Sequence, residues 1–247
     1  MLKYVILGII QGITEFLPVS SSGHLVIMKQ ILGISSQELP LYVVLHLGTA
    51  LSLIIFFFKD ILMTLRNKKT LLLIALVTII TGTIGIIGEE FFEKLFSSPR
   101  LVALALIITG IILIFTRKFS QAERSILHIK DALILGVTQG IAIIPGISRS
   151  GITISTLLFR KIDRETAFKF SFLASIPAII GAALLEVKKV DITLRTDMIN
   201  FTVGFIASFF TGLFSLWVLK LVLRKAKFHY FGYYCIFVAL ITLLFIR

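Results

Sequence analysis

The chain has 247 residues, of which 57% are hydrophobic and only 15% are charged, and its mean hydropathy is +1.02. This composition excludes an ordinary soluble domain, because such a domain could not bury so much apolar surface. The net charge of +12 does not indicate a nucleic-acid-binding protein, because the basic residues lie in short loops between apolar runs, where they report membrane topology.

The chain begins with two short apolar segments, roughly residues 4–17 and 22–33, joined by the polar turn 18–23. A helix rises about 1.5 Å per residue, so each segment reaches only about 20 Å of the roughly 30 Å hydrocarbon core. They therefore predict a re-entrant helical hairpin whose turn lies at membrane depth, surrounded by protein or a water-filled cavity. We interpret residues 1–30 as mature protein, because Glu15 interrupts the apolar stretch that a signal peptide needs.

Longer apolar segments, which are able to span the bilayer, follow each of two hairpins. In the first half they cover roughly residues 41–58, 71–88 and 100–116. The second half has a matching hairpin at 131–144 and 151–160, followed by spans at 168–186, 199–219 and 229–246. We expect Pro177 to kink the first of these spans, and Cys235 to face lipid or fill the core.

An internal repeat relates the two halves. When the sequence is shifted by 128 residues, residues 6–23 align without a gap with residues 134–151, and nine of the 18 positions are identical. Apolar bias can match isoleucines and leucines, but the shared Gln-Gly and Ser-x-Ser-Gly pairs indicate a duplication. We therefore expect one membrane domain, residues 1–247, with repeats at about 1–120 and 128–247.

The charges of the loops predict the orientation. The connections at 59–69, 117–130, 160–164 and 220–227 are basic, whereas the connection at 89–94 is acidic on balance. Basic loops stay inside, so both termini lie outside, the first hairpin enters from outside and the second from the cytoplasm. The expected fold is an all-α polytopic membrane protein with an inverted-topology repeat, each half a re-entrant helical hairpin plus three transmembrane helices.

Four side chains in the hairpins are the first catalytic candidates, because polar groups within a membrane are costly. They are Glu15, Ser21, His24 and Arg149. Under the repeat Ser21 corresponds to Arg149, whereas Glu15 and His24 correspond to isoleucines. One half thus supplies a carboxylate, a hydroxyl and an imidazole, and the other supplies a guanidinium, which indicates a shared site with divided roles.

Arg149 suits a phosphate, because its planar fork donates two parallel hydrogen bonds and stays charged when desolvated. Gly146 and Gly151 would let backbone N–H groups approach the same anion. The alternative is a structural ion pair between Arg149 and Glu15.

His24 follows Ser21 by three residues, so one helical turn could bring imidazole and hydroxyl together for nucleophile activation or leaving-group protonation. The alternative is a helix-capping serine and a packing histidine. Glu15 follows Gln11 by one turn and could orient His24 or bind a divalent cation. We interpret His46, in the first long span, as a packing residue.

Two stretches resemble the signatures of a known family. They are Gln11-x-x-x-Glu15 with the following Phe-Leu-Pro-Val-Ser-Ser-Ser-Gly-His, residues 16–24, and Pro-Gly-Ile-Ser-Arg-Ser-Gly-Ile-Thr, residues 145–153. They resemble undecaprenyl-diphosphate phosphatases of the bacitracin-resistance type, and the length, span pattern and duplication extend the resemblance over essentially the whole chain. It implies hydrolysis of undecaprenyl diphosphate to undecaprenyl phosphate and inorganic phosphate, which recycles the lipid carrier of peptidoglycan synthesis. It also implies help from Mg²⁺ or Ca²⁺ and a site facing the outer side of the cytoplasmic membrane.

Carried over residue by residue, the resemblance points to Glu15, Ser21, His24, Ser148, Arg149 and Thr153, and to Gln11. Together with the polar and glycine residues of the two turns, these give the expected site. The expected catalytic residues are Glu15, Ser21, His24 and Arg149. The expected phosphate-binding residues are Ser20, Ser22, Gly146, Ser148, Arg149, Ser150 and Thr153. Glu15 and Gln11 are candidate metal ligands, although the family also uses Glu at the position of Gln11, so this chain lacks one carboxylate there. Whether Ser21 or His24 attacks phosphorus stays open.

Two other functions stay in view. A second superfamily of lipid phosphatases has a Pro-Ser-Gly-His segment that Ser22-Gly23-His24 resembles, but this chain has no Arg-Pro, and residue 155 is a serine where that superfamily needs a histidine. A polyprenyl-phosphate flippase or transporter is the other alternative, because inverted repeats with broken helices are typical of that class. The expected partners are a polyprenyl diphosphate lipid and membrane lipids, with no nucleic acid and with a homodimer left open.

Overall fold

The computed structural model describes residues 1–31, 39–96, 98–119, 123–189 and 198–245, with side chains except at residues 29, 39 and 184–189. In this part of the chain every regular element is helical, apart from one isolated bridge between Arg124 and Ile162. The helices are α1 (Leu2–Phe16), α2 (Ser21–Ile31), α3 (Leu39–Phe56), α4 (Phe58–Leu65), α5 (Lys68–Ile87), α6 (Glu89–Phe96), α7 (Pro99–Phe115), the 3₁₀ helix η2 (Thr116–Phe119), α8 (Ile129–Ile141), α9 (Arg149–Phe159), α10 (Arg164–Lys189), α11 (Met198–Arg224) and α12 (Tyr230–Phe245).

The described helices make the chain a multi-pass membrane protein. Four of them are long and apolar enough to cross a membrane: Lys68–Ile87, Pro99–Phe119, Arg164–Ala183 and Met198–Arg224. The pair Pro40–Phe56 and Phe58–Leu65 passes the same test together but bends by 69°, and Tyr230–Phe245 is a shorter apolar helix. Each of the six predicted spans therefore has a helical counterpart.

The predicted ranges differ from the structure at two places in the first half. The expected span at 41–58 bends at Phe57, and the amphipathic helix α4 continues from it. The connection at 89–94 forms α6, whose first turn carries Glu89 and Glu90, and acidic side chains there stabilise a helix N-terminus. Cys235 is buried in the core, so of the two expected roles it fills the core and does not face lipid. Pro177 lies inside α10, which continues to Lys189, so the expected kink stays a prediction.

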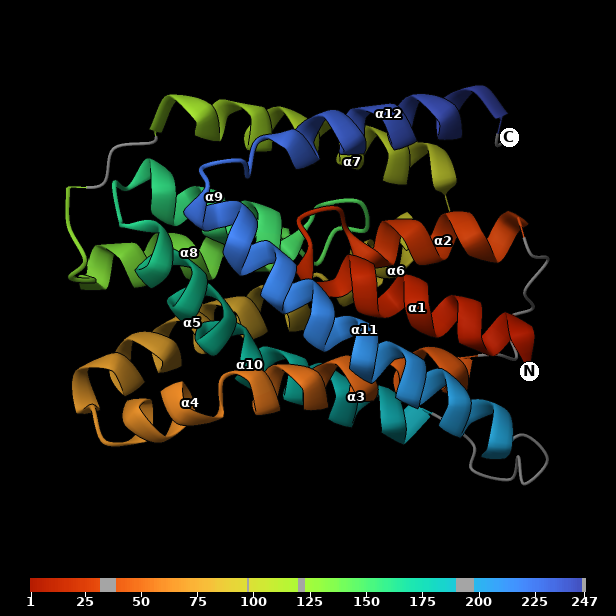
Figure 1. Ribbon diagram of the computed structural model, residues 1–247, viewed down its shortest axis with the longest axis horizontal. Helices are drawn as coiled ribbons and strands as arrows, with labels where there is room; N and C mark the ends of the chain where they lie inside the picture. The colour runs from red at the N-terminus through yellow and green to blue at the C-terminus, as the bar shows by residue number, and fades with distance from the viewer. Residues whose placement is uncertain (32–38, 97, 120–122, 190–197, 246–247) are drawn as a thin grey trace.

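The two short-helix pairs, α1–α2 and α8–α9, enter the molecule from opposite ends, and their turns meet at its centre (Figure 1). The helix α11 crosses diagonally in front of them, while α7 and α12 lie together along one edge of the view (Figure 1). The lengths of these short helices agree with the predicted hairpins.

Matched glycines let each hairpin pack closely on a long helix. A Cβ atom on Gly12 of α1 would lie 2.5 Å from the carbonyl oxygen of Ser208 in α11 and would overlap the Thr211 hydroxyl. At the corresponding position in the second half, a Cβ atom on Gly140 of α8 would lie 2.5 Å from the Cδ1 atom of Ile84 in α5. Small residues thus allow the close helix contacts that membrane interiors favour.

An aromatic cluster lies next to the hairpin turns. Phe16, Phe57, Phe168 and Phe172 are almost fully buried, and their rings contact one another at centroid distances of 5.2–5.7 Å. Such contacts fix the end of α1, the junction between α3 and α4, and α10 against one another. The cluster therefore forms a rigid apolar wall beside the polar turns.

Candidate active site

Glu15 lies at the end of α1, immediately before the turn that reverses the chain into α2. Because α2 begins at Ser21, the turn brings the Ser21 hydroxyl back to the carboxylate, and Ser21 Oγ donates a hydrogen bond to Glu15 Oε2 at 2.6 Å. Gln11, one turn earlier on α1, donates from Nε2 to the same oxygen at 3.1 Å. The Glu15 side chain is only 11% exposed, so these donors take the place of water.

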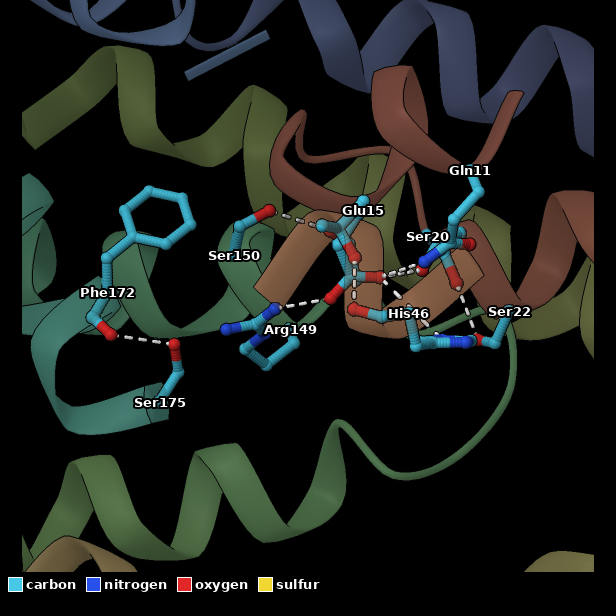
Figure 2. A network of polar contacts seen from close by, with 12 residues as sticks. Gln11, Glu15, Ser20, Ser22, His46, Arg149, Ser150, Phe172 and Ser175 are labelled. Atoms are coloured by element: carbon cyan, nitrogen blue, oxygen red, sulfur yellow. Dashed lines mark hydrogen bonds and ion pairs between the residues drawn. The ribbon is translucent and has the colours of Figure 1, made fainter. Parts of the chain in front are cut away.

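Arg149, the first residue of α9, approaches Glu15 from the other half of the chain. Its Nη2 atom donates to Glu15 Oε1 at 2.6 Å, and its guanidinium carbon lies 6.0 Å from the ring centre of Phe172. Its Nη1 atom is buried and has no hydrogen-bond partner among the described residues. A buried donor of this kind is costly to leave unsatisfied. Nη1 is therefore available to donate a hydrogen bond to a bound anion. Figure 2 shows Arg149, His46 and Gln11 gathered around Glu15.

The two hairpin turns contact each other through Ser20 and Gly146. Ser20 has a φ of +66°, and its hydroxyl accepts hydrogen bonds from the N–H groups of Gly23 at 3.3 Å and Gly146 at 3.1 Å. Gly146 has a φ of +96°, and a Cβ atom there would lie 2.7 Å from the Ala105 methyl group. Glycine therefore meets both a backbone and a space requirement.

The expected phosphate-binding hydroxyls already have partners inside the protein. Ser148 Oγ accepts from the Gly151 N–H at 3.2 Å and lies 3.4 Å from the hydroxyl of Ser150, as Ser20 does for Gly23 and Ser22 in the first hairpin. Thr153 Oγ1 donates to the Arg149 carbonyl at 2.6 Å. These contacts shape the turns and the first turn of α9, and the role of the hydroxyls as phosphate ligands stays a prediction.

His24 lies apart from Ser21. Its Nδ1 atom is 2.9 Å from the Ser20 carbonyl oxygen and its Nε2 atom is 2.9 Å from the Tyr234 hydroxyl. The expected contact between His24 and Ser21 is thus replaced by a bond from Ser21 to Glu15, because an ionised carboxylate is the stronger acceptor. Tyr234, on α12, was not among the sequence candidates.

His46 was interpreted as a packing residue, but the structure places it beside Glu15. Its Nε2 atom is 4.0 Å from Glu15 Oε2, and its Nδ1 atom is 2.8 Å from the carbonyl oxygen of Tyr42. The sequence does contain a signal for this role of His46, because an ionisable side chain inside an apolar span is costly and is by default a functional candidate.

The donor set does not fit a divalent cation held by the protein alone. Both oxygens of Glu15 already accept hydrogen bonds, and Arg149 brings a positive charge to the same carboxylate. The described residues contain no group of three or more His, Cys, Asp or Glu side chains that could hold a metal ion. Gln11 Oε1 is buried without a partner in that part of the chain, but one neutral oxygen is far from the six or more ligands that Mg²⁺ or Ca²⁺ takes.

Comparisons with known proteins agree over nearly the whole chain. A family model described as bacitracin resistance protein BacA matches residues 4–241. A protein of Halothermothrix orenii named undecaprenyl-diphosphatase is 42% identical over 250 residues, which cover 98% of this chain and 96% of the relative. Proteins with the same name from Thermotoga petrophila and Thermodesulfovibrio yellowstonii are 43% and 40% identical, over 97% and 99% of this chain and 98% and 96% of the relatives.

Proposed function

The chain belongs to the bacitracin resistance protein BacA family, and we propose that it hydrolyses undecaprenyl diphosphate to undecaprenyl phosphate and inorganic phosphate. The relatives that match it over 96% and 98% of their length carry the name undecaprenyl-diphosphatase. The observation that carries the proposal is the group formed by Ser21, Glu15 and Arg149. A hydroxyl is bonded to a carboxylate, beside a guanidinium with one buried donor that has no partner among the described residues.

In the proposed reaction Ser21 is the nucleophile. Its Oγ atom attacks the terminal phosphorus, its proton passes to Glu15, and the bridging P–O bond breaks with its electron pair on undecaprenyl phosphate. Water then attacks the phosphoserine, which returns the Ser21 hydroxyl and releases inorganic phosphate. His24 is less suited to the attack, because both of its ring nitrogens already have partners.

Arg149 binds the terminal phosphate in this proposal. One arm of the guanidinium stays on Glu15 while Nη1 donates to a phosphate oxygen, so a single side chain orients the base and neutralises charge as it develops. A divalent cation, Mg²⁺ or Ca²⁺, would enter bound to the diphosphate, whose oxygens supply ligands that the protein lacks.

We propose that the protein lies in the cytoplasmic membrane as an inverted repeat, with the active site facing the outer side. The basic loops support this orientation. The entry of the two hairpins from opposite ends and the matched close packing at Gly12 and Gly140 support the inverted repeat (Figure 1).

Phosphate release by pure protein in detergent tests the function, because a flippase has no second leaflet to serve there. Wild type should release phosphate from undecaprenyl diphosphate, and Ser21→Ala should lower release to a small residual rate. Ser215→Ala is the matched control, because it removes another hydroxyl inside the protein, one that donates to the Thr211 carbonyl of its own helix. Pure wild-type protein that releases no phosphate would overturn the proposal.

The shared role of Ser21 and Glu15 has its own test. Because both act in one proton transfer, Ser21→Ala combined with Glu15→Gln should be little slower than Ser21→Ala alone. Rate losses that multiply would show that the two groups act independently.

A further inference from the structure

His46 presents a proton-accepting nitrogen to Glu15. A backbone carbonyl can only accept a hydrogen bond, so the contact of Nδ1 with the Tyr42 carbonyl at 2.8 Å assigns the proton of the neutral ring to Nδ1. Nε2 then carries the free lone pair, and it faces Glu15 Oε2 at 4.0 Å. His24 has no such nitrogen, because Tyr234 and Ser20 occupy both of its ring positions.

The His46 side chain is also more accessible to water than the Glu15 carboxylate. Its side chain is 31% exposed, against 11% for Glu15 and 17% for Arg149. Among the described residues, Arg149 and His46 are the ionisable side chains that form ion pairs with Glu15. Arg149 stays charged and does not carry protons. A proton on Glu15 therefore reaches water most directly through His46.

The proposed reaction needs such a route. When Ser21 attacks, its proton remains on Glu15, and a protonated carboxyl group cannot take a proton from the water that must hydrolyse the phosphoserine. Hydrolysis of the trianionic diphosphate to two dianionic phosphates releases one proton in total. That proton has to leave the buried carboxylate between the two chemical steps.

We propose that His46 is the proton carrier of the reaction, a role that rests on the proposed function. After the first step Nε2 accepts the proton of Glu15 and passes it to water, which restores the carboxylate as the base for the second step. The separation of 4.0 Å is about 1 Å longer than a hydrogen bond, so a small rotation of the imidazole completes the contact. The water that attacks next gives its proton to Glu15, from which Ser21 Oγ takes it on leaving.

His46→Gln, which keeps a polar side chain but cannot carry a proton, tests the proposal. We expect its steady-state rate to fall about 100-fold, in the range of general acid–base contributions, while one equivalent of undecaprenyl phosphate per enzyme still forms rapidly. Phosphorylated Ser21 should accumulate and be visible by mass spectrometry of acid-quenched protein. His229→Gln, which changes the histidine immediately before α12, is the matched control and should behave as wild type.

His46→Ala with added imidazole separates proton transfer from packing. The side chain is partly exposed, so free imidazole should enter the vacated space and restore the rate of the alanine variant, but not that of His46→Gln. A structural role would show instead as a lower melting temperature in detergent without rescue, and that result would overturn the proposal. Equal steady-state rates for wild type and His46→Gln would also overturn it. Either result leaves the proposed function intact, which fails only if wild type itself releases no phosphate.

Discussion

Replacement of Arg149 by lysine separates its two contacts. In the structure Nη2 is on Glu15 at 2.6 Å while Nη1 has no partner in the described part of the chain. The sequence presented phosphate binding and ion pairing as alternatives, but this geometry allows both at once. Lysine keeps the positive charge but has a single nitrogen. It can donate to Glu15 or to the phosphate, but it cannot bind both as the two Nη atoms of the arginine do.

The expected loss follows from one hydrogen bond. A bond to a charged group contributes about 1.5–3 kcal/mol, and each 1.36 kcal/mol is a factor of ten in rate, so Arg149→Lys should lower kcat/KM about 10- to 150-fold. Its stability should stay within about 1 kcal/mol of wild type, because Glu15 keeps a cation. Arg149→Ala leaves a buried carboxylate without its cation and should lose about 3–5 kcal/mol, most of which Glu15→Gln should restore.

The assay measures phosphate release and thermal unfolding in detergent on the same preparations. Arg100→Lys, at an exposed position of α7, is the matched control and should change neither quantity. A stable Arg149→Lys protein with the wild-type kcat/KM would refute the assignment of Nη1 to the phosphate.

Two further predictions concern orientation and packing. Single-cysteine labelling from outside intact cells should reach Glu90→Cys and miss Lys68→Cys, and labelling of the latter would reverse the proposed topology. Gly12→Ala should destabilise the protein by about 1–3 kcal/mol through overpacking against α11. Its control is Gly82→Ala, where nothing lies within 4 Å of the added methyl group, and this variant should be neutral or stabilising by up to about 1 kcal/mol. Equal melting temperatures for the two variants would contradict the close contact of Gly12 with α11.

The fold was predictable where helix length and polarity decide it. The short apolar pieces around a Ser-rich turn could not cross a bilayer, and they form the pairs α1–α2 and α8–α9. The 69° bend at Phe57 was not predictable, because the apolar sequence continues through it and the direction of α4 depends on contacts with other helices.

The site was predictable in part. The repeat indicated that Arg149 would share a site with Glu15 and Ser21 from the opposite half, and in the structure Ser21 and Arg149 both donate hydrogen bonds to Glu15; their catalytic roles stay predictions. Spacing along α2 does not determine which partner a side chain chooses, so His24 turned out to contact Tyr234 and not Ser21. The approach of His46 to Glu15 depends on the packing of α3 beside α1, and local sequence patterns do not predict this packing.

The hydrogen bond between the Gly146 N–H and Ser20 has a consequence for how the molecule can move. A carrier must expose its site alternately to the two sides of the membrane, which requires its halves to rock against each other. Here such rocking would break the contact between the two turns and pull Arg149 away from Glu15 in every cycle. We therefore expect the two halves to stay locked together during turnover, with products leaving on the side from which the substrate entered.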